Sequence, residues 1–155
     1  MGFTINHEQA AQGKYLVPEG TYEAQIREAK FDTTGSGTEF IRLRLQIRED
    51  IDQNEGGQSF DWPIWKLKAP ASKDPGGYSN ARLQNISRCA GLADGTQLEG
   101  MADLLQAWTG RAIKVDIKHN ERNGYTNADV GHIYPSEHPD IRQGFVAVDD
   151  GDLPF

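Results

Sequence analysis

The sequence contains a single cysteine, Cys89, and no long apolar run. One thiol cannot form a disulfide within the chain, and nothing else in the sequence requires an oxidising compartment. The longest apolar runs, such as residues 145–148, are a few residues long, far below the roughly 20 that a membrane-spanning helix needs. They are also too short for a signal peptide, and Asn6 replaces the Ser or Thr of a myristoylation signal. We therefore expect a cytoplasmic protein without a membrane partner.

Basic residues are scarce as well, with 16 Lys and Arg against 23 Asp and Glu, a net charge of -7. More than half of this excess lies in residues 135–155, which carry -4, so residues 1–134 carry only -3. A nearly neutral body can still present one basic face, which is what phosphate binding requires. The length of 155 residues suits one domain. We expect a folded domain at residues 1–134 and a flexible acidic tail at residues 135–155.

Residue spacings typical of catalytic or metal sites are missing. Cys89 lies at an apolar position of a predicted helix, where a buried, inert thiol is usual. His119 and His132 could face each other across a hairpin, but two ligands without a thiolate make a weak zinc site. The run at residues 35–37, Gly-Ser-Gly, has no lysine and no following helix, so it predicts a turn rather than a phosphate loop. We expect a non-enzymatic protein with no metal and no cofactor.

Alternation of apolar and polar residues predicts three strands in the first half of the chain. The first begins at Thr21 and changes parity near Glu28, which indicates a bulge. A Gly-rich turn leads to the second, residues 40–48, where the alternation is cleanest. The third, residues 58–68, contains Pro63. Because proline lacks the N–H of a ladder, we expect this strand to be an edge or to carry a bulge.

The second half predicts two helices and a hairpin. Apolar residues recur with helical spacing over residues 78–90 and 98–108. Strands at 113–118 and 126–134 flank Asn123-Gly124, a favoured hairpin turn. Five strands, with a helical insertion of about 35 residues between the third and fourth, match the order of the OB-fold. A β-sandwich needs more strands, and a ferredoxin-like domain needs a helix after the first. We predict a mainly β protein, a five-stranded OB-fold barrel.

The outward side of the second strand combines an aromatic ring with arginines. Its members, at alternate positions, are Phe40, Arg42, Arg44 and Arg48. Alternate residues of a strand point to the same side. Single-strand binding needs flat surfaces on which bases stack and positive charge along the backbone. A solvated face whose arginines pair with acids such as Glu23 explains the pattern equally well, so this strand alone leaves both interpretations open.

The third strand favours nucleic-acid binding. Trp62 and Trp65 are three residues apart and point to opposite sides unless Pro63 introduces a bulge, so at least one should leave the interior. An exposed Trp beside Lys66 and Lys68 suits a base, and such stacking contributes roughly 1–3 kcal/mol per base. Strands two and three form the binding face of OB-folds. Five further residues could extend this binding face, and each could equally have a structural role: Tyr78, Arg82, Lys114, Lys118 and Tyr125.

The end of the chain combines aspartates with apolar residues. These are Asp149, Asp150, Asp152, Leu153, Pro154 and Phe155. The ending resembles the acidic C-terminal tip of bacterial single-stranded-DNA-binding proteins, in which aspartates precede an aliphatic residue, Pro and Phe; here Gly151 interrupts the aspartates. The resemblance implies recruitment of replication or recombination proteins. A metal-dependent nuclease built on these aspartates is rejected, because a flexible segment cannot preorganise ligands.

Three segments carry a second resemblance: residues 2–8, 18–23 and 60–66. They are similar to a family of phage-encoded proteins, long catalogued as of unknown function and placed among phage single-stranded-DNA-binding proteins. The resemblance covers most of residues 1–134. It implies an OB-fold and a role in phage DNA replication or recombination, and it does not identify the stacking aromatics.

Two functions from different classes therefore remain. The first is sequence-tolerant, non-enzymatic binding of single-stranded DNA in phage DNA replication, recombination or repair, with partners recruited through the C-terminal tip. The second is an acidic protein-binding inhibitor or adaptor that acts on host DNA-binding proteins, which the net charge of -7 alone favours. A homodimer would add affinity through multivalency, and no residue pattern indicates one.

Overall fold

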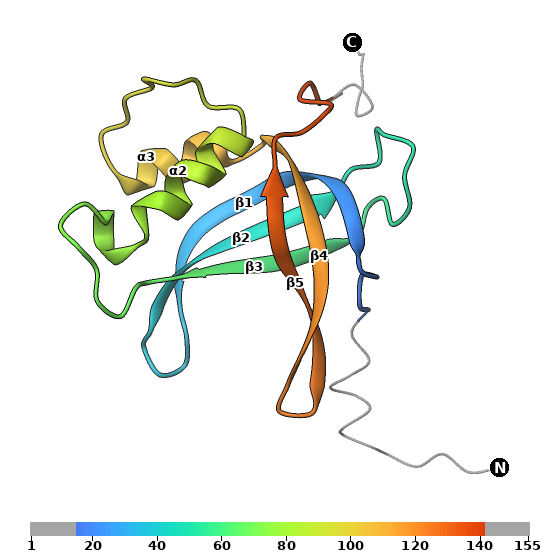
Figure 1. The fold of residues 1–155 in the computed structure, drawn as a ribbon, viewed down its shortest axis with the longest axis horizontal. Helices are drawn as coiled ribbons and strands as arrows, with labels where there is room; N and C mark the ends of the chain where they lie inside the picture. Colours follow the sequence, from blue (N-terminus) through green and yellow to red (C-terminus); the bar gives the residue numbers. More distant parts are fainter. Residues whose placement is uncertain (1–14, 142–155) are drawn as a thin grey trace, which may run out of the picture.

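A computed structural model describes residues 15–141 as one antiparallel sheet with two helices on one side (Figure 1). Its elements in chain order are β1 (Gly20–Thr33), β2 (Glu39–Ile47), β3 (Ser59–Trp65), the short 3₁₀ turn η1 (Pro75–Gly77), α2 (Asn80–Cys89), α3 (Met101–Trp108), β4 (Ala112–Arg122) and β5 (Tyr125–Tyr134). The strand order is β3-β2-β1-β4-β5. The mainly β class and the helical insertion between β3 and β4 are confirmed. The sheet is open, because β3 and β5 are its two edges in the described residues, so the expected closed barrel is not present.

β1 is a long, bent strand that pairs with two neighbours along different parts of its length. Its first residues pair with β4, whereas the stretch from Ala24 to Thr33 pairs with β2. The register shifts between Ile26 and Glu28, which confirms the predicted bulge. At this bulge the backbone N–H of Gly110, just after α3, donates to the carbonyl of Ile26 over 2.6 Å. The bulge therefore bends the sheet and ties it to the helical layer.

The core lies between the inner side of the sheet and the helices. It contains Trp108, whose side chain is fully buried and whose Nε1 donates to Ser87 Oγ over 2.9 Å. Cys89 is also buried, as its helical position predicts. The expected helix at 98–108 is shorter in the structure, since α3 begins only after Gly100, which has an extended backbone. Leu98 consequently lies outside the helix and is exposed.

β3 alternates without a bulge. Phe60, Trp62 and Ile64 point into the core, and Asp61, Pro63 and Trp65 point outward. Pro63 is tolerated because β3 is an edge strand, as predicted.

The terminal hairpin has the predicted turn. Asn123 and Gly124 both have positive φ, 56° and 81°, the geometry of a two-residue hairpin turn that follows strand twist. His119 pairs with Ala128 rather than facing His132. The expected histidine pair across the hairpin is therefore wrong, because β5 continues past Ala128 before His132 is reached.

The chain after β5 stays in contact with the body as far as Asp140. Ser136 Oγ donates to Glu23 Oε1 over 2.5 Å, and the Glu137 N–H donates to Glu23 Oε2 over 3.0 Å. Residues 136–140, in the segment predicted as a tail, therefore contact the folded body. No helix among the described residues is long and apolar enough to cross a membrane.

Candidate nucleic-acid interface

The side of β1, β2 and β3 that points away from the core forms a surface that we call the outer face. Strand register sets its three rows, one residue from each strand. The rows are Asp32, Phe40 and Trp65; Lys30, Arg42 and Pro63; and Glu28, Arg44 and Asp61. The outer face thus has an aromatic end and a charged end. Four of the residues predicted to bind nucleic acid lie on it: Phe40, Arg42, Arg44 and Trp65.

The aromatic end consists of two rings in contact. The centroids of Phe40 and Trp65 are 4.7 Å apart with their planes inclined by 37°. Trp65 is 48% exposed, which confirms that one of the two tryptophans leaves the interior. Phe40 is only 7% exposed, since Trp65 and the Arg42 guanidinium, 5.4 Å from its centroid, cover it. Phe40 was predicted to bind nucleic acid from the outward side of its strand, but its covered ring packs beneath Trp65 and is not open to a base.

Trp62 is not part of the interface. Its side chain is 9% exposed and belongs to the core cluster. The strand alternates regularly through Pro63, so the two tryptophans point to opposite sides and only Trp65 can meet a ligand on the outer face.

The charged end of the outer face is electrically balanced. Arg42 Nη2 lies 2.8 Å from Asp32 Oδ2, and Arg42 Nη1 lies 3.0 Å from Asp61 Oδ2. Arg44 Nε lies 3.2 Å from Asp61 Oδ1. The Thr33 N–H, followed by Arg42, lowers the pKa of the Asp32 carboxyl below its ordinary value. Ion pairing, one of the two interpretations that the sequence allowed, thus describes the free protein, although its acids are Asp32 and Asp61 rather than Glu23.

Arg48 does not belong to the outer face, and its predicted contact with phosphate is wrong. It follows the end of β2, and its side chain is only 2% exposed. Its Nε and Nη2 donate to the two oxygens of Asp50 over 2.9 and 2.7 Å, and its Nη1 lies 3.9 Å from Glu23 Oε1. Arg48 Nη1 also donates to the carbonyl of His138. Arg48 therefore holds the segment after β5 against the body.

The segment after β3 carries two exposed lysines. Lys66 Nζ lies 3.5 Å from Glu39 Oε2, and Lys68 is exposed. Tyr78 is completely buried and its hydroxyl donates to Glu39 Oε2 over 2.8 Å. Burial, with the hydrogen bond to Glu39, raises the pKa of Tyr78. The prediction that Tyr78 extends the binding surface is wrong, because its ring is part of the core.

The remaining predicted residues are dispersed. Arg82 is exposed on α2, and Lys114 on β4 forms an ion pair with Glu137. Lys118 and Tyr125 are exposed on the hairpin, where Lys118 pairs in register with Asp129. The partner-binding residues predicted at 149–155 lie outside the described residues.

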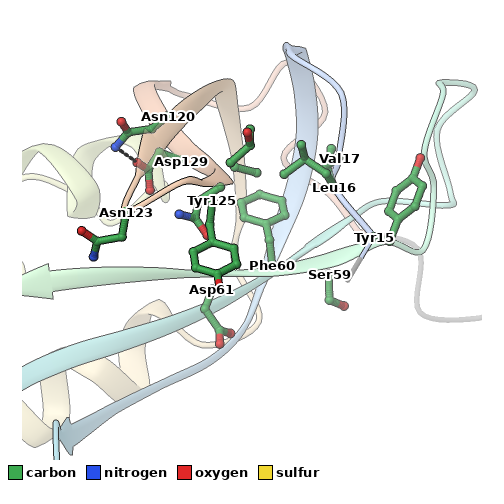
Figure 2. Close-up of a pocket in the computed structure, with 13 residues that line it drawn as sticks. Tyr15, Leu16, Val17, Ser59, Phe60, Asp61, Asn120, Asn123, Tyr125 and Asp129 are labelled. Atoms are coloured by element: carbon green, nitrogen blue, oxygen red, sulfur yellow. Dashed lines mark hydrogen bonds between the residues drawn. The ribbon is translucent and has the colours of Figure 1, made fainter. Parts of the chain in front are cut away.

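Between the two sheet edges lies a second surface, which we call the groove (Figure 2). Its volume is about 720 Å³. The lining includes Tyr15, Phe60 and Asp61 on one side and Asn120, Asn123, Tyr125, Asn127 and Asp129 on the other. Sequence reasoning found only Tyr125 among them, because the edges that meet here are more than fifty positions apart in the chain and their polar residues have no periodic pattern.

Comparison with known proteins gives a family but no activity. In the part of the chain that the structure describes, no group of three or more His, Cys, Asp or Glu residues could hold a metal ion. A search of curated proteins found no match. A family model described as "Protein of unknown function (DUF669)" matches residues 3–141. Because the match spans most of its length, the chain belongs to this family.

Proposed function

We propose that this protein is a non-enzymatic, sequence-tolerant binder of single-stranded DNA that acts in phage DNA replication, recombination or repair in the bacterial host cytoplasm. The observation that carries the proposal is Trp65, a half-exposed indole backed by Phe40 on the outer face. Every base has a π-face, so an exposed ring on a rigid strand binds bases regardless of sequence. Backing by Phe40 fixes the ring and reduces the entropy lost when a base stacks on it.

The strand order supports an OB-type architecture for this binder. In the order β3-β2-β1-β4-β5, with helices between β3 and β4, contact between the two edge strands is all that a five-stranded barrel still needs. We infer an OB-fold opened at the junction of β3 and β5. In OB-folds the face of strands two and three, flanked by the turns after strands one and four, binds oligonucleotides. The outer face occupies this position.

Phosphate contacts in this proposal come from Arg42, Arg44, Lys66 and Lys68. A phosphate oxygen can replace a carboxylate oxygen on a guanidinium, because both anions suit its planar fork of donors. Exchange is easiest at Arg44, whose side chain is 49% exposed, and harder at Arg42, which two carboxylates hold. The proposed interface therefore relies on stacking more than on free positive charge.

The sharpest test uses the difference in exposure among the three tryptophans. Trp62 and Trp108 are buried, so an added oligo-dT should quench Trp65 fluorescence selectively. Trp65→Ala should weaken affinity by roughly 1–3 kcal/mol, whereas Trp65→Phe should retain most of it. Leu98→Ala, which removes an exposed apolar side chain beside the helices, is the matched control. Unchanged affinity and unchanged quenching in Trp65→Ala would refute the outer face as the binding site.

A second function is favoured by the balanced charge of the outer face together with the net charge of -7. In this case the protein is an acidic inhibitor or adaptor of host DNA-binding proteins. No oligonucleotide would then bind at low salt, and host DNA-binding proteins would be captured in a salt-sensitive pull-down.

Recruitment of replication proteins through residues 149–155 is part of the first proposal. Deletion of these residues should abolish that recruitment while single-strand affinity stays equal or rises slightly.

A further inference from the structure

The groove differs from the outer face in its chemistry. Among the described residues, the lining contains two carboxylates, Asp61 and Asp129, and no Lys or Arg, so these residues disfavour phosphate. It also contains three asparagine side chains, together with Tyr125, which Figure 2 shows reaching from the hairpin toward β3. A volume of about 720 Å³ falls within the roughly 300–1,000 Å³ typical of small-molecule sites. The groove therefore suits an uncharged, planar ligand that forms hydrogen bonds.

Polar groups in the groove are available to such a ligand. Asn120 Nδ2 donates to Asp129 Oδ2 over 2.9 Å, which orients the carboxylate and leaves Asp129 Oδ1 as an acceptor (Figure 2). The side chains of Asn123, Asn127 and Tyr125 form no hydrogen bond with any other described residue. An oriented carboxylate beside two uncommitted amides can recognise the edge of a base.

Asp61 lies on the border between the two surfaces. It lines the groove and also pairs with Arg42 and Arg44 on the outer face. A strand crossing this border would keep its phosphates on the arginine side, because the groove carboxylates repel them. Its bases would then be free to turn into the groove.

We propose that the groove takes one unstacked base of the bound strand and prefers a base with an exocyclic amino group, so that cytosine binds there more tightly than thymine. The amino N–H of cytosine donates to the Asp129 carboxylate, whereas thymine offers only the O4 acceptor at this position, which a carboxylate disfavours. The Tyr125 ring provides the stacking surface. This inference rests on the proposed function and adds a modest preference to a binder that is otherwise sequence-tolerant.

The test compares labelled oligo-dC and oligo-dT of about 16 nucleotides, titrated with the full chain at low salt. The unmodified protein should bind oligo-dC on the order of tenfold more tightly. Asp129→Asn should abolish this preference, since the new amide can donate to thymine O4. Asp103→Asn, which removes the same charge from α3, is the control and should retain the preference.

The outcomes of this test distinguish failure of the base-selective groove from failure of the proposed function. Equal binding of oligo-dC and oligo-dT by the unmodified protein, or a preference that survives in Asp129→Asn, would overturn the base-selective groove and leave the proposed function intact. Failure to bind either oligonucleotide would overturn both. Asn120→Ala serves as a second variant in case Asp129→Asn is unfolded, because it removes the donor that orients the Asp129 carboxylate and leaves the carboxylate itself in place. It should reduce the preference for oligo-dC.

Discussion

Arg44 and Arg48 lie four residues apart in one alternating stretch, yet they differ in exposure and in the groups that they contact. Arg44 is 49% exposed on the outer face and meets a single carboxylate, Asp61. Arg48 is 2% exposed and meets two, Glu23 and Asp50, as well as the chain after β5. Periodicity sets the side of the strand on which a residue lies. Whether that side is covered depends on another segment of the chain, here the one around His138, ninety positions after Arg48.

The largest expected difference between the two arginines is in the free energy of unfolding. Arg48→Met keeps the apolar stem and removes the guanidinium that pairs with buried Glu23 and Asp50, so we expect a loss of about 3–5 kcal/mol in the free energy of unfolding. Arg44→Met removes an exposed partner and should cost about 1 kcal/mol or less. Urea unfolding measures both. Similar losses in the two variants would show that the Arg48 cluster is no more than a surface ion pair.

In single-strand binding we expect the exposed arginines of the outer face, rather than Arg48, to have the larger effect. The double variant Asp32→Asn, Asp61→Asn releases Arg42 and Arg44 from their carboxylates, so oligo-dT should bind several-fold more tightly at low salt. Each additional phosphate that these arginines bind should steepen the log-log salt dependence by about 0.7. Asp103→Asn, Asp94→Asn removes the same charge away from the outer face and serves as the control. A double variant at Asp32 and Asp61 with unchanged affinity would mean that these arginines do not meet phosphate.

The smallest expected effect is on the pH dependence of stability. The pKa of Asp32 is lower in the folded protein than its ordinary value of about 3.9, because the Thr33 N–H and Arg42 stabilise its ionised form. Its contribution is therefore present above that ordinary pKa and is lost as the pH falls through the lower, folded value. Thermal unfolding between pH 6 and 2.5 should show a slightly shallower acid dependence in Asp32→Asn. An unaltered profile would contradict this assignment.

Local patterns predicted much of the fold. The bulge near Glu28, the edge position of Pro63 and the Asn123-Gly124 turn each have a short-range physical cause, so a few residues suffice to reveal them. Whether the barrel closes was not predictable in this way. Closure depends on how β3 and β5 meet, and these strands are separated in the chain by the helical insertion and by β4.

The candidate site was predicted less completely, for reasons of packing. Alternation placed Arg44 on the outer side and required one of Trp62 and Trp65 to leave the interior, but it could not show that neighbours cover Phe40 or that Tyr78 lies in the core. The groove residues Asn120 and Asn127 gave no signal, since a polar hairpin is equally consistent with a solvated loop. Contacts between different strands and segments, which no local pattern contains, account for these differences.

Pro63 also affects how copies of this chain meet one another. An edge strand offers its unpaired backbone groups to any other strand, and this is a route to aggregation. On β3 the proline removes one donor from that edge, and Asp61 places a carboxylate two residues before it. A strand from a second copy would find an interrupted ladder and a negative charge. Pairing of β3 with a strand of a second copy is therefore disfavoured along this edge of the sheet.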